Sequence, residues 1–154
     1  MDNIYLKPMT DKMYHEYFKE YENDYDLFLD KSEFFKYVYD EEQVNKYIEK
    51  QKTLKRICLA IMKDDEMIGE IKLHHITPES ATLGISIKND KYKNQGYGTI
   101  AEQLVIDYVF NKLNKKVLLA DTILTNTRSQ HVLEKVGFQK VGEDERSFYY
   151  KIER

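Results

Sequence analysis

The sequence contains few of the residues typical of secreted or membrane proteins. Its 154 residues include one cysteine, Cys58, and no tryptophan. A single cysteine excludes an internal disulfide bond and is typical of a reducing compartment, so we expect a cytoplasmic protein. No hydrophobic run approaches the ~20 residues of a membrane-spanning helix, and no signal-peptide pattern is present at the N-terminus. We therefore expect no membrane partner.

Proline and glycine are also scarce, which bounds the domain organisation. Two prolines and six glycines leave no segment with the composition of a linker, and the chain has no internal repeat. Because 42% of the residues are hydrophobic, we expect one domain with its own core over residues 1–154. The net charge of −3 disfavours nucleic acid as the partner. No His, Cys and Asp residues have metal-ligand spacing, so we predict no metal.

The most informative stretch runs from a predicted strand through a loop into a predicted helix. Leu83, Ile85 and Ile87 alternate with small or polar residues, as in a half-buried strand. After Gly96 and Gly98, apolar residues recur at helical spacing. A helix N-terminus offers free N–H groups and partial positive charge, and glycines let a phosphate approach the backbone. The stretch predicts a diphosphate-binding loop, with a plain strand–loop–helix connection as the alternative.

A dinucleotide-binding fingerprint is one specific interpretation of this loop. Gly96-x-Gly98-x-x-Ala101 matches the fingerprint, and Asp121 follows where an acidic ribose ligand can lie. That fingerprint belongs to the first turn of a repeated βαβ array, whereas three predicted strands linked by short turns lead directly into the loop here. Only 33 residues follow Asp121 (154 − 121), too few for the rest of a doubly wound sheet. An NAD-binding oxidoreductase is therefore disfavoured.

The periodicity along the chain predicts alternating strands and helices. The strand at 81–87 and the strand after the loop helix must be near parallel, because a helix joins them. Gly137 is expected at the C′ position of the last helix. We expect strands at 3–7, 56–62, 67–76, 81–87, 117–123, 138–141 and 146–152. We expect a helix capped by Thr10, a helical region over 32–54 in one or two pieces with Ser32 as its cap, a helix over 96–114, and a last helix that follows residues 126–129 and carries Val132, Leu133 and Val136.

The N-terminal region is acidic and rich in tyrosine. Residues 11–50 contain twelve Asp and Glu against six Lys, together with seven of the chain's tyrosines. Such a surface suits a cationic amine through charge and cation–π contacts. The alternative is a solvated acidic face over a core that uses tyrosine.

Two motifs resemble those of the GNAT N-acetyltransferase superfamily. The segment Lys93-Asn94-Gln95-Gly96-Tyr97-Gly98 resembles its coenzyme A pyrophosphate loop, Q/R-x-x-G-x-G/A, with lysine at the first position. The segment from Asn126 through Ser129 to Glu134-Lys135-Val136-Gly137-Phe138 resembles the motif N-x-x-[SA]…E-K-x-G-F. The resemblance covers roughly residues 66–152, and the N-terminal helices match by position only. The second motif resembles most the branch of RimJ/RimL-type and polyamine acetyltransferases.

The resemblance implies a GNAT fold, an α/β (α+β-like) domain. Its central sheet is mixed, mostly antiparallel and twisted, with about seven strands and about four helices. Residues 1–55 then supply a strand and the acceptor-side helices, and residues 56–154 the cofactor-binding part. The implied activity is acetyl transfer from acetyl-CoA to a primary amine. The alternative is a non-catalytic sensor that binds acetyl-CoA. The implied partners are acetyl-CoA and a cationic amine, for a monomer or homodimer.

The resemblance also implies individual site residues. Glu70 is the expected base, at a position often acidic in the family; the alternative is an exposed strand residue. Side-chain alternation puts Glu70, Lys72 and His74 on one face of the strand. Many relatives place a Tyr acid where this chain has Leu133, so Ser129 is the expected partner of the sulfur, with helix capping as the alternative. The expected cofactor-binding residues are Ile85, Ser86, Ile87, Lys93, Asn94, Gln95, Gly96, Tyr97, Gly98, Thr99, Asn126, Ser129 and Lys135.

Overall fold

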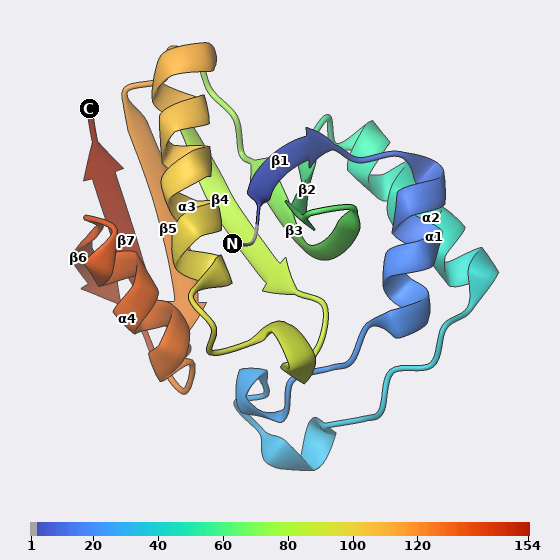
Figure 1. Ribbon diagram of the computed structural model, residues 1–154. Helices are drawn as coiled ribbons and strands as arrows, with labels where there is room; N and C mark the ends of the chain where they lie inside the picture. Colours follow the sequence, from blue (N-terminus) through green and yellow to red (C-terminus); the bar gives the residue numbers. More distant parts are fainter. Residues whose placement is uncertain (1–2) are drawn as a thin grey trace.

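The computed structural model describes residues 3–154 and contains one seven-stranded sheet of order β1-β2-β3-β4-β5-β7-β6 (Figure 1). Neighbouring strands are antiparallel except for β4 and β5, which are parallel. The predicted mixed, mostly antiparallel sheet is confirmed. The strands are β1 Ile4–Pro8, β2 Ile57–Lys63, β3 Glu66–His74, β4 Ser80–Ile87, β5 Val117–Ile123, β6 Gln139–Glu143 and β7 Ser147–Glu153.

Four α-helices cover the two faces of the sheet. Side chains of α3, such as Ala101 and Val105, share the main core with alternate residues of the central strands. The first two helices lie on the opposite face, where Tyr14 packs with Val44 in a second cluster. The α-helices are α1 Asp11–Glu20, α2 Glu41–Thr53, α3 Tyr97–Asp107 and α4 Thr127–Lys135; short helical turns are η1 Tyr25–Leu27, η2 Lys31–Glu33, η3 Asp90–Tyr92 and the π-helix η4 Tyr108–Lys112.

The strand register confirms the predicted alternation of faces along β3. Glu70 pairs with Ser86 of β4, and Lys72 pairs with Gly84. The hydroxyl of Tyr47 on α2 contacts both Glu70 and Lys72, so these two side chains lie on the α2 face. Ile71, between them, is completely buried in the core on the other face.

The helix predicted over 32–54 is wrong in its first part. Only α2 is helical there, and its cap is Asp40, whose side chain accepts a hydrogen bond from Gln43 N. Ser32 lies inside η2, which Asp30 caps. The physical reason is tertiary packing, which overrides the local pattern: residues 34–39 form neither helix nor strand, and from this segment Tyr37 packs against Phe18 of α1.

The C-terminal end of α4 matches the prediction for Gly137, which has a φ of 113°. Its N–H donates to Glu134 O, and Phe138 N donates to Leu133 O over 2.9 Å. These two bonds form a Schellman motif, which satisfies the last carbonyl groups of the helix. The helix predicted to run to residue 114 is an α-helix only as far as Asp107. The π-helix η4 follows it directly.

Two further findings apply to residues 3–154. No helix there combines the length and the apolarity needed to cross a membrane. Nor does this part of the chain group three or more His, Cys, Asp or Glu side chains so that they can hold a metal ion.

Candidate active site

Within residues 3–154, three of the four α-helices begin with a capping side chain, and α3 does not. Thr10 caps α1, Asp40 caps α2 and Asn126 caps α4, each by accepting a hydrogen bond from a backbone N–H of the first turn. The N-cap of α3 is Gly96, which has no side chain and a φ of 84°. The first N–H groups of α3, at the positive end of its dipole, therefore donate to no capping side chain within residues 3–154.

The backbone at the start of α3 is open to a ligand. A Cβ atom added at Gly96 or Gly98 would meet no atom within 4 Å. The side chain of Gln95 folds back, and its Nε2 donates to the Lys91 carbonyl. The loop thus presents backbone rather than side chains, which is the arrangement that holds a diphosphate.

A gap between β4 and β5 lies beside this loop. The two strands are paired only from Ser80 to Leu83 on β4 and from Val117 to Ala120 on β5, and they separate beyond that point (Figure 1). The last four residues of β4 remain paired with β3 on one side only. Because backbone groups of a strand point alternately to its two neighbours, every second peptide group there faces the gap.

A cavity of about 330 Å³ extends from the loop to α4, and a second of about 220 Å³ lies in the gap itself. The two share lining residues on β4, α3 and α4. The sequence-predicted cofactor residues that line the first cavity are Ile85, Ser86, Ile87, Lys93, Asn94, Gly96, Tyr97, Gly98, Thr99, Asn126, Ser129 and Lys135. Gln95 and Glu70 line neither cavity.

Glu70 is buried one strand behind the cavity wall. Its side chain is 3% exposed, so the alternative of an exposed strand residue is wrong. The Tyr47 hydroxyl donates to Glu70 Oε1 over 2.8 Å and accepts from Lys72 Nζ over 2.7 Å. Burial raises the pKa of Glu70; hydrogen bonding by Tyr14 and Tyr47 and the charge of Lys72 offset this only in part.

The wall in front of Glu70 is formed by Ser86, its cross-strand neighbour. Residues directly opposite on antiparallel strands lie on the same face with Cβ atoms about 5 Å apart. The Ser86 hydroxyl is within 2.9 Å of the Tyr17 hydroxyl on α1. Hydroxyl groups therefore separate the Glu70 carboxylate from the cavity.

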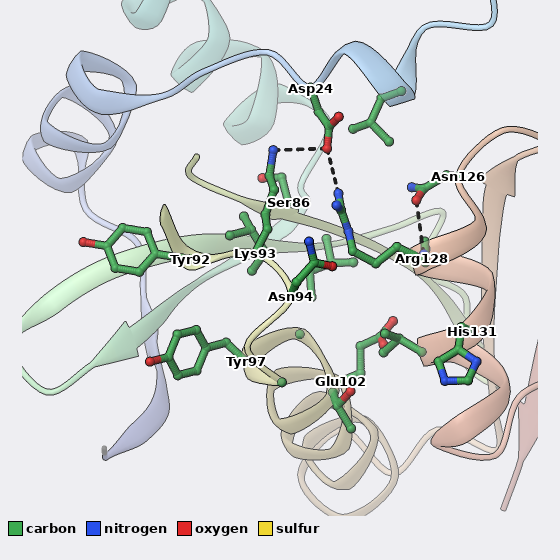
Figure 2. A pocket seen from close by; sticks show the side chains of 18 of the residues that line it. Asp24, Ser86, Tyr92, Lys93, Asn94, Tyr97, Glu102, Asn126, Arg128 and His131 are labelled. Atoms are coloured by element: carbon green, nitrogen blue, oxygen red, sulfur yellow. Dashed lines mark hydrogen bonds and ion pairs between the residues drawn. The ribbon is translucent and has the colours of Figure 1, made fainter. Parts of the chain in front are cut away.

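Asp24 joins the N-terminal segment to both sides of the first cavity, and sequence reasoning missed it. Its Oδ2 lies 3.1 Å from Lys93 Nζ and 2.6 Å from the Arg128 guanidinium, as Figure 2 shows. Burial raises the pKa of Asp24, but hydrogen bonds from Arg128, Asp26 and Lys93 outweigh that effect and lower it overall. Lys93 also pairs with Asp90. The positive charge predicted for the loop is thus already neutralised by carboxylates.

Glu102 is a second buried carboxyl group that sequence reasoning missed. It lies on α3, is 2% exposed, and lines both cavities (Figure 2). Its Oε2 has no hydrogen-bond partner in residues 3–154. Burial alone raises its pKa to about 8. The one signal in the sequence was a carboxylate beside Ala101 and three positions before Val105, on the apolar side of the helix.

Asn126 and Ser129 lie together at the start of α4 and line both cavities. The Asn126 side chain accepts from Ser129 N over 3.1 Å and thereby caps the helix. The hydroxyl of Ser129 is not used for this cap. Leu133, where many relatives place a Tyr, is buried and lines the second cavity.

Most tyrosines of the N-terminal region pack on one another rather than into the cavity. Tyr14 and Tyr47 meet edge to face, and Tyr21 packs against Tyr37 in the same way. Of the seven tyrosines between residues 11 and 50, Tyr21 alone lines the first cavity, beside Glu22. For the other tyrosines of this region, the alternative of a core that uses tyrosine therefore applies.

Comparisons with known proteins agree with this geometry. The family model described as "Acetyltransferase (GNAT) domain" matches residues 3–139. The chain is 26% identical over 107 residues to the uncharacterized N-acetyltransferase YnaD of Bacillus subtilis (strain 168), a match that covers 68% of this chain and 63% of YnaD. The chain thus spans less than two thirds of that relative's length.

Two solved structures with bound coenzyme share the fold. Campylobacter jejuni N-acetyltransferase PseH in complex with acetyl coenzyme A has a TM-score of 0.70 at 22% identity, with 99% of each chain covered. The ribosomal L7/L12 α-N-protein acetyltransferase RimL in complex with coenzyme A has a TM-score of 0.80 at 15% identity, with 97% of this chain and 93% of RimL covered. Because the family model matches residues 3–139, which is most of this chain, the chain belongs to the GNAT acetyltransferase domain family.

Proposed function

We propose that this protein transfers the acetyl group of acetyl-CoA to a primary amine by direct attack of the amine in a ternary complex. The observation that carries the proposal is the uncapped N-terminus of α3, which opens into a cavity sharing its lining with the gap between β4 and β5. Bound acetyl-CoA supplies the acetyl group and a thiolate leaving group. We assign residues 1–154 to one acetyltransferase domain.

The diphosphate is assigned to the backbone N–H groups from Gly96 to Thr99. The open space at both loop glycines gives it access, and the α3 dipole favours its charge. The pantetheine arm is assigned to the gap, against the unpaired edge of β4 at Ile85 and Ile87. An N–H group of that edge is then placed to stabilise charge on the thioester oxygen.

Glu70 is the proposed base for the amine. A primary amine with a pKa near 10 is mostly protonated at neutral pH and must lose a proton before it attacks. Because Glu70 is 3% exposed, the proton reaches it through the hydroxyl groups of Ser86 and Tyr17 or through water at that wall. The raised pKa of Glu70 makes it a stronger proton acceptor once it is ionised.

The acceptor is proposed to be a small cationic amine or a peptide N-terminus. Tyr21 and Glu22 line the first cavity from the N-terminal segment and supply an aromatic ring and a carboxylate. The fold shared with RimL and the replacement of Tyr by Leu133 support assignment to the RimJ/RimL-like branch. Ser129, whose hydroxyl lines both cavities, is assigned to hydrogen bond the coenzyme sulfur.

A coenzyme-binding sensor without turnover is the second candidate. The observation that favours it is the position of Glu70, which lines neither cavity and is already hydrogen bonded to Tyr47. A protein of this kind would bind acetyl-CoA with the same loop and gap but would not activate an amine.

The test is acetyl-CoA-dependent thiol release over polyamines, aminoglycosides and short peptides, beside calorimetric binding of acetyl-CoA. Release above the amine-free blank with one class supports the transferase and names its acceptor. Binding without release supports the sensor, and absence of binding overturns the phosphate-loop assignment. In the transferase, Glu70→Gln lowers turnover and leaves coenzyme affinity unchanged, whereas the control Glu145→Gln, at an exposed turn, changes neither.

A further inference from the structure

The departing sulfur needs a proton, and the residues assigned so far do not supply it. At the position of the usual Tyr acid this chain has Leu133, which has no proton to give. Ser129 can hydrogen bond the sulfur, but an aliphatic hydroxyl is a far weaker acid than a thiol, whose pKa is about 8.5. A group that protonates a thiolate efficiently has a pKa close to that of the thiol.

Glu102 carries an exchangeable proton at the junction of the two cavities. Of the ionisable side chains that line either cavity, Glu102 alone lines both. Of the residues with a hydroxyl group, Ser129 alone lines both. Its Oε2 is buried and has no partner in residues 3–154, although a buried polar atom ordinarily has one. The remaining ionisable groups belong to one cavity only: Asp121 to the second, and Tyr21, Glu22, Asp24, Tyr92, Lys93, Tyr97, Arg128, His131 and Lys135 to the first.

The surroundings of Glu102 keep its carboxyl group neutral at neutral pH. The side chain is 2% exposed, and Ala101 and Val105 beside it on α3 belong to the apolar core. Burial raises its pKa to about 8, and none of the charged groups that line the cavities changes this value. Such a carboxyl group can donate a proton at neutral pH, as an exposed glutamate cannot.

We propose that Glu102 is a catalytic acid, which donates its carboxyl proton to the coenzyme sulfur as the carbon–sulfur bond breaks. This inference rests on the proposed function. The ammonium gives one proton to the base before attack. The neutral nitrogen then forms the new bond to the acetyl carbon and loses a second proton to solvent, while the electron pair of the broken carbon–sulfur bond goes to sulfur. Sulfur takes the Glu102 proton, and the resulting carboxylate regains a proton from solvent before the next turnover.

The kinetic test uses Glu102→Gln, which keeps the size and neutrality of the side chain but has no acidic proton. We expect kcat to fall by about a hundredfold, the range of general-acid contributions, while the KM for acetyl-CoA and the Kd of coenzyme A stay within about twofold. Glu102→Asp restores part of kcat. Gln103→Ala, at an exposed neighbouring position, is the control. Unchanged kcat, or a rise in KM and Kd with kcat unchanged, overturns the proposal; the latter makes Glu102 a pantetheine-binding group.

A spectroscopic test is independent of turnover. Infrared difference spectra at neutral pH should contain a protonated-carboxyl C=O band that Glu102→Gln lacks. We expect coenzyme A to shift this band and desulfo-coenzyme A, which lacks the sulfur, to leave it unshifted. Equal shifts with both ligands, or no shift with either, overturn the proposal. If the wild-type protein releases no thiol with any amine, the proposed function fails, and these spectra still decide whether Glu102 faces the bound sulfur.

Discussion

Replacing Glu102 by Gln should make the protein more stable at neutral and alkaline pH. Its Oε2 is buried and has no hydrogen-bond partner in residues 3–154, and the pKa of Glu102 in the folded protein is about 8 against an ordinary value of 4.5. The folded state holds the Glu102 proton more tightly than the unfolded state does. The contribution of Glu102 to the free energy of unfolding is therefore most favourable below the pKa that the group has in the unfolded state. It is lost as pH rises through the folded pKa.

The size of this loss follows from the two pKa values. They differ by 3.5 units (8 − 4.5), and each unit corresponds to about 1.4 kcal/mol, which gives an upper bound of about 5 kcal/mol above pH 8. Between the two pKa values, stability falls by about 1.4 kcal/mol per pH unit. Glutamine does not titrate, so the variant lacks this term altogether.

Urea unfolding of wild type and Glu102→Gln at several pH values between about 5 and 8 measures the effect. All other titrating groups contribute equally to both proteins, so the difference in unfolding free energy isolates Glu102. We expect this difference to move in favour of the variant by up to about 4 kcal/mol across that range. A difference that does not change with pH would refute the reasoning, since it would mean that Glu102 is already ionised in the folded protein.

Three further substitutions test other parts of the structure. Gly69→Ala places a Cβ 2.6 Å from the Ser86 carbonyl oxygen and should lower the unfolding free energy by about 1–3 kcal/mol; an unchanged Tm contradicts it. Asp24→Asn removes the carboxylate that Lys93 and Arg128 share beside the loop and should tighten coenzyme A binding about fivefold in calorimetry, a gain that added salt removes. Tyr47→Phe removes a donor to Glu70, which raises the Glu70 pKa; the acidic limb of the pH–rate profile should then move to higher pH.

The elements that frame the site could be predicted because their signals are local. The alternation Leu83, Ile85, Ile87 reflects one face of β4 turned to the core, and a period of two is specific to strands. The end of α4 could be placed because Gly137 adopts a φ that other residues avoid. The start of α3 could be placed for the same reason, because Gly96 has a φ of 84°.

The parts that escaped prediction depend on contacts between distant positions. Asp24 is an ordinary acidic residue in the sequence, and its role arises from Arg128, 104 residues away. The course of residues 21–40 is set by tertiary packing: Tyr37 packs against Phe18 of α1, and Phe28 packs against Phe34 and Phe35 within the segment. The helical pattern places Glu102 on the apolar side of α3, but its position at the gap depends on how α3 meets β4 and β5, which are distant in the sequence.

The position of β7 between β5 and β6 has a consequence for the order of folding. During synthesis β5 and β6 emerge first, and their unpaired edges remain exposed until β7 can enter between them. β7 then pairs with β5 along its whole length, from Val117 to Ile123, whereas β4 pairs only with the first half of β5. The β5 wall of the gap is thus supported by β7, a strand that follows it in the chain, and a nascent chain arrested before β7 should be aggregation-prone and unable to hold a ligand there.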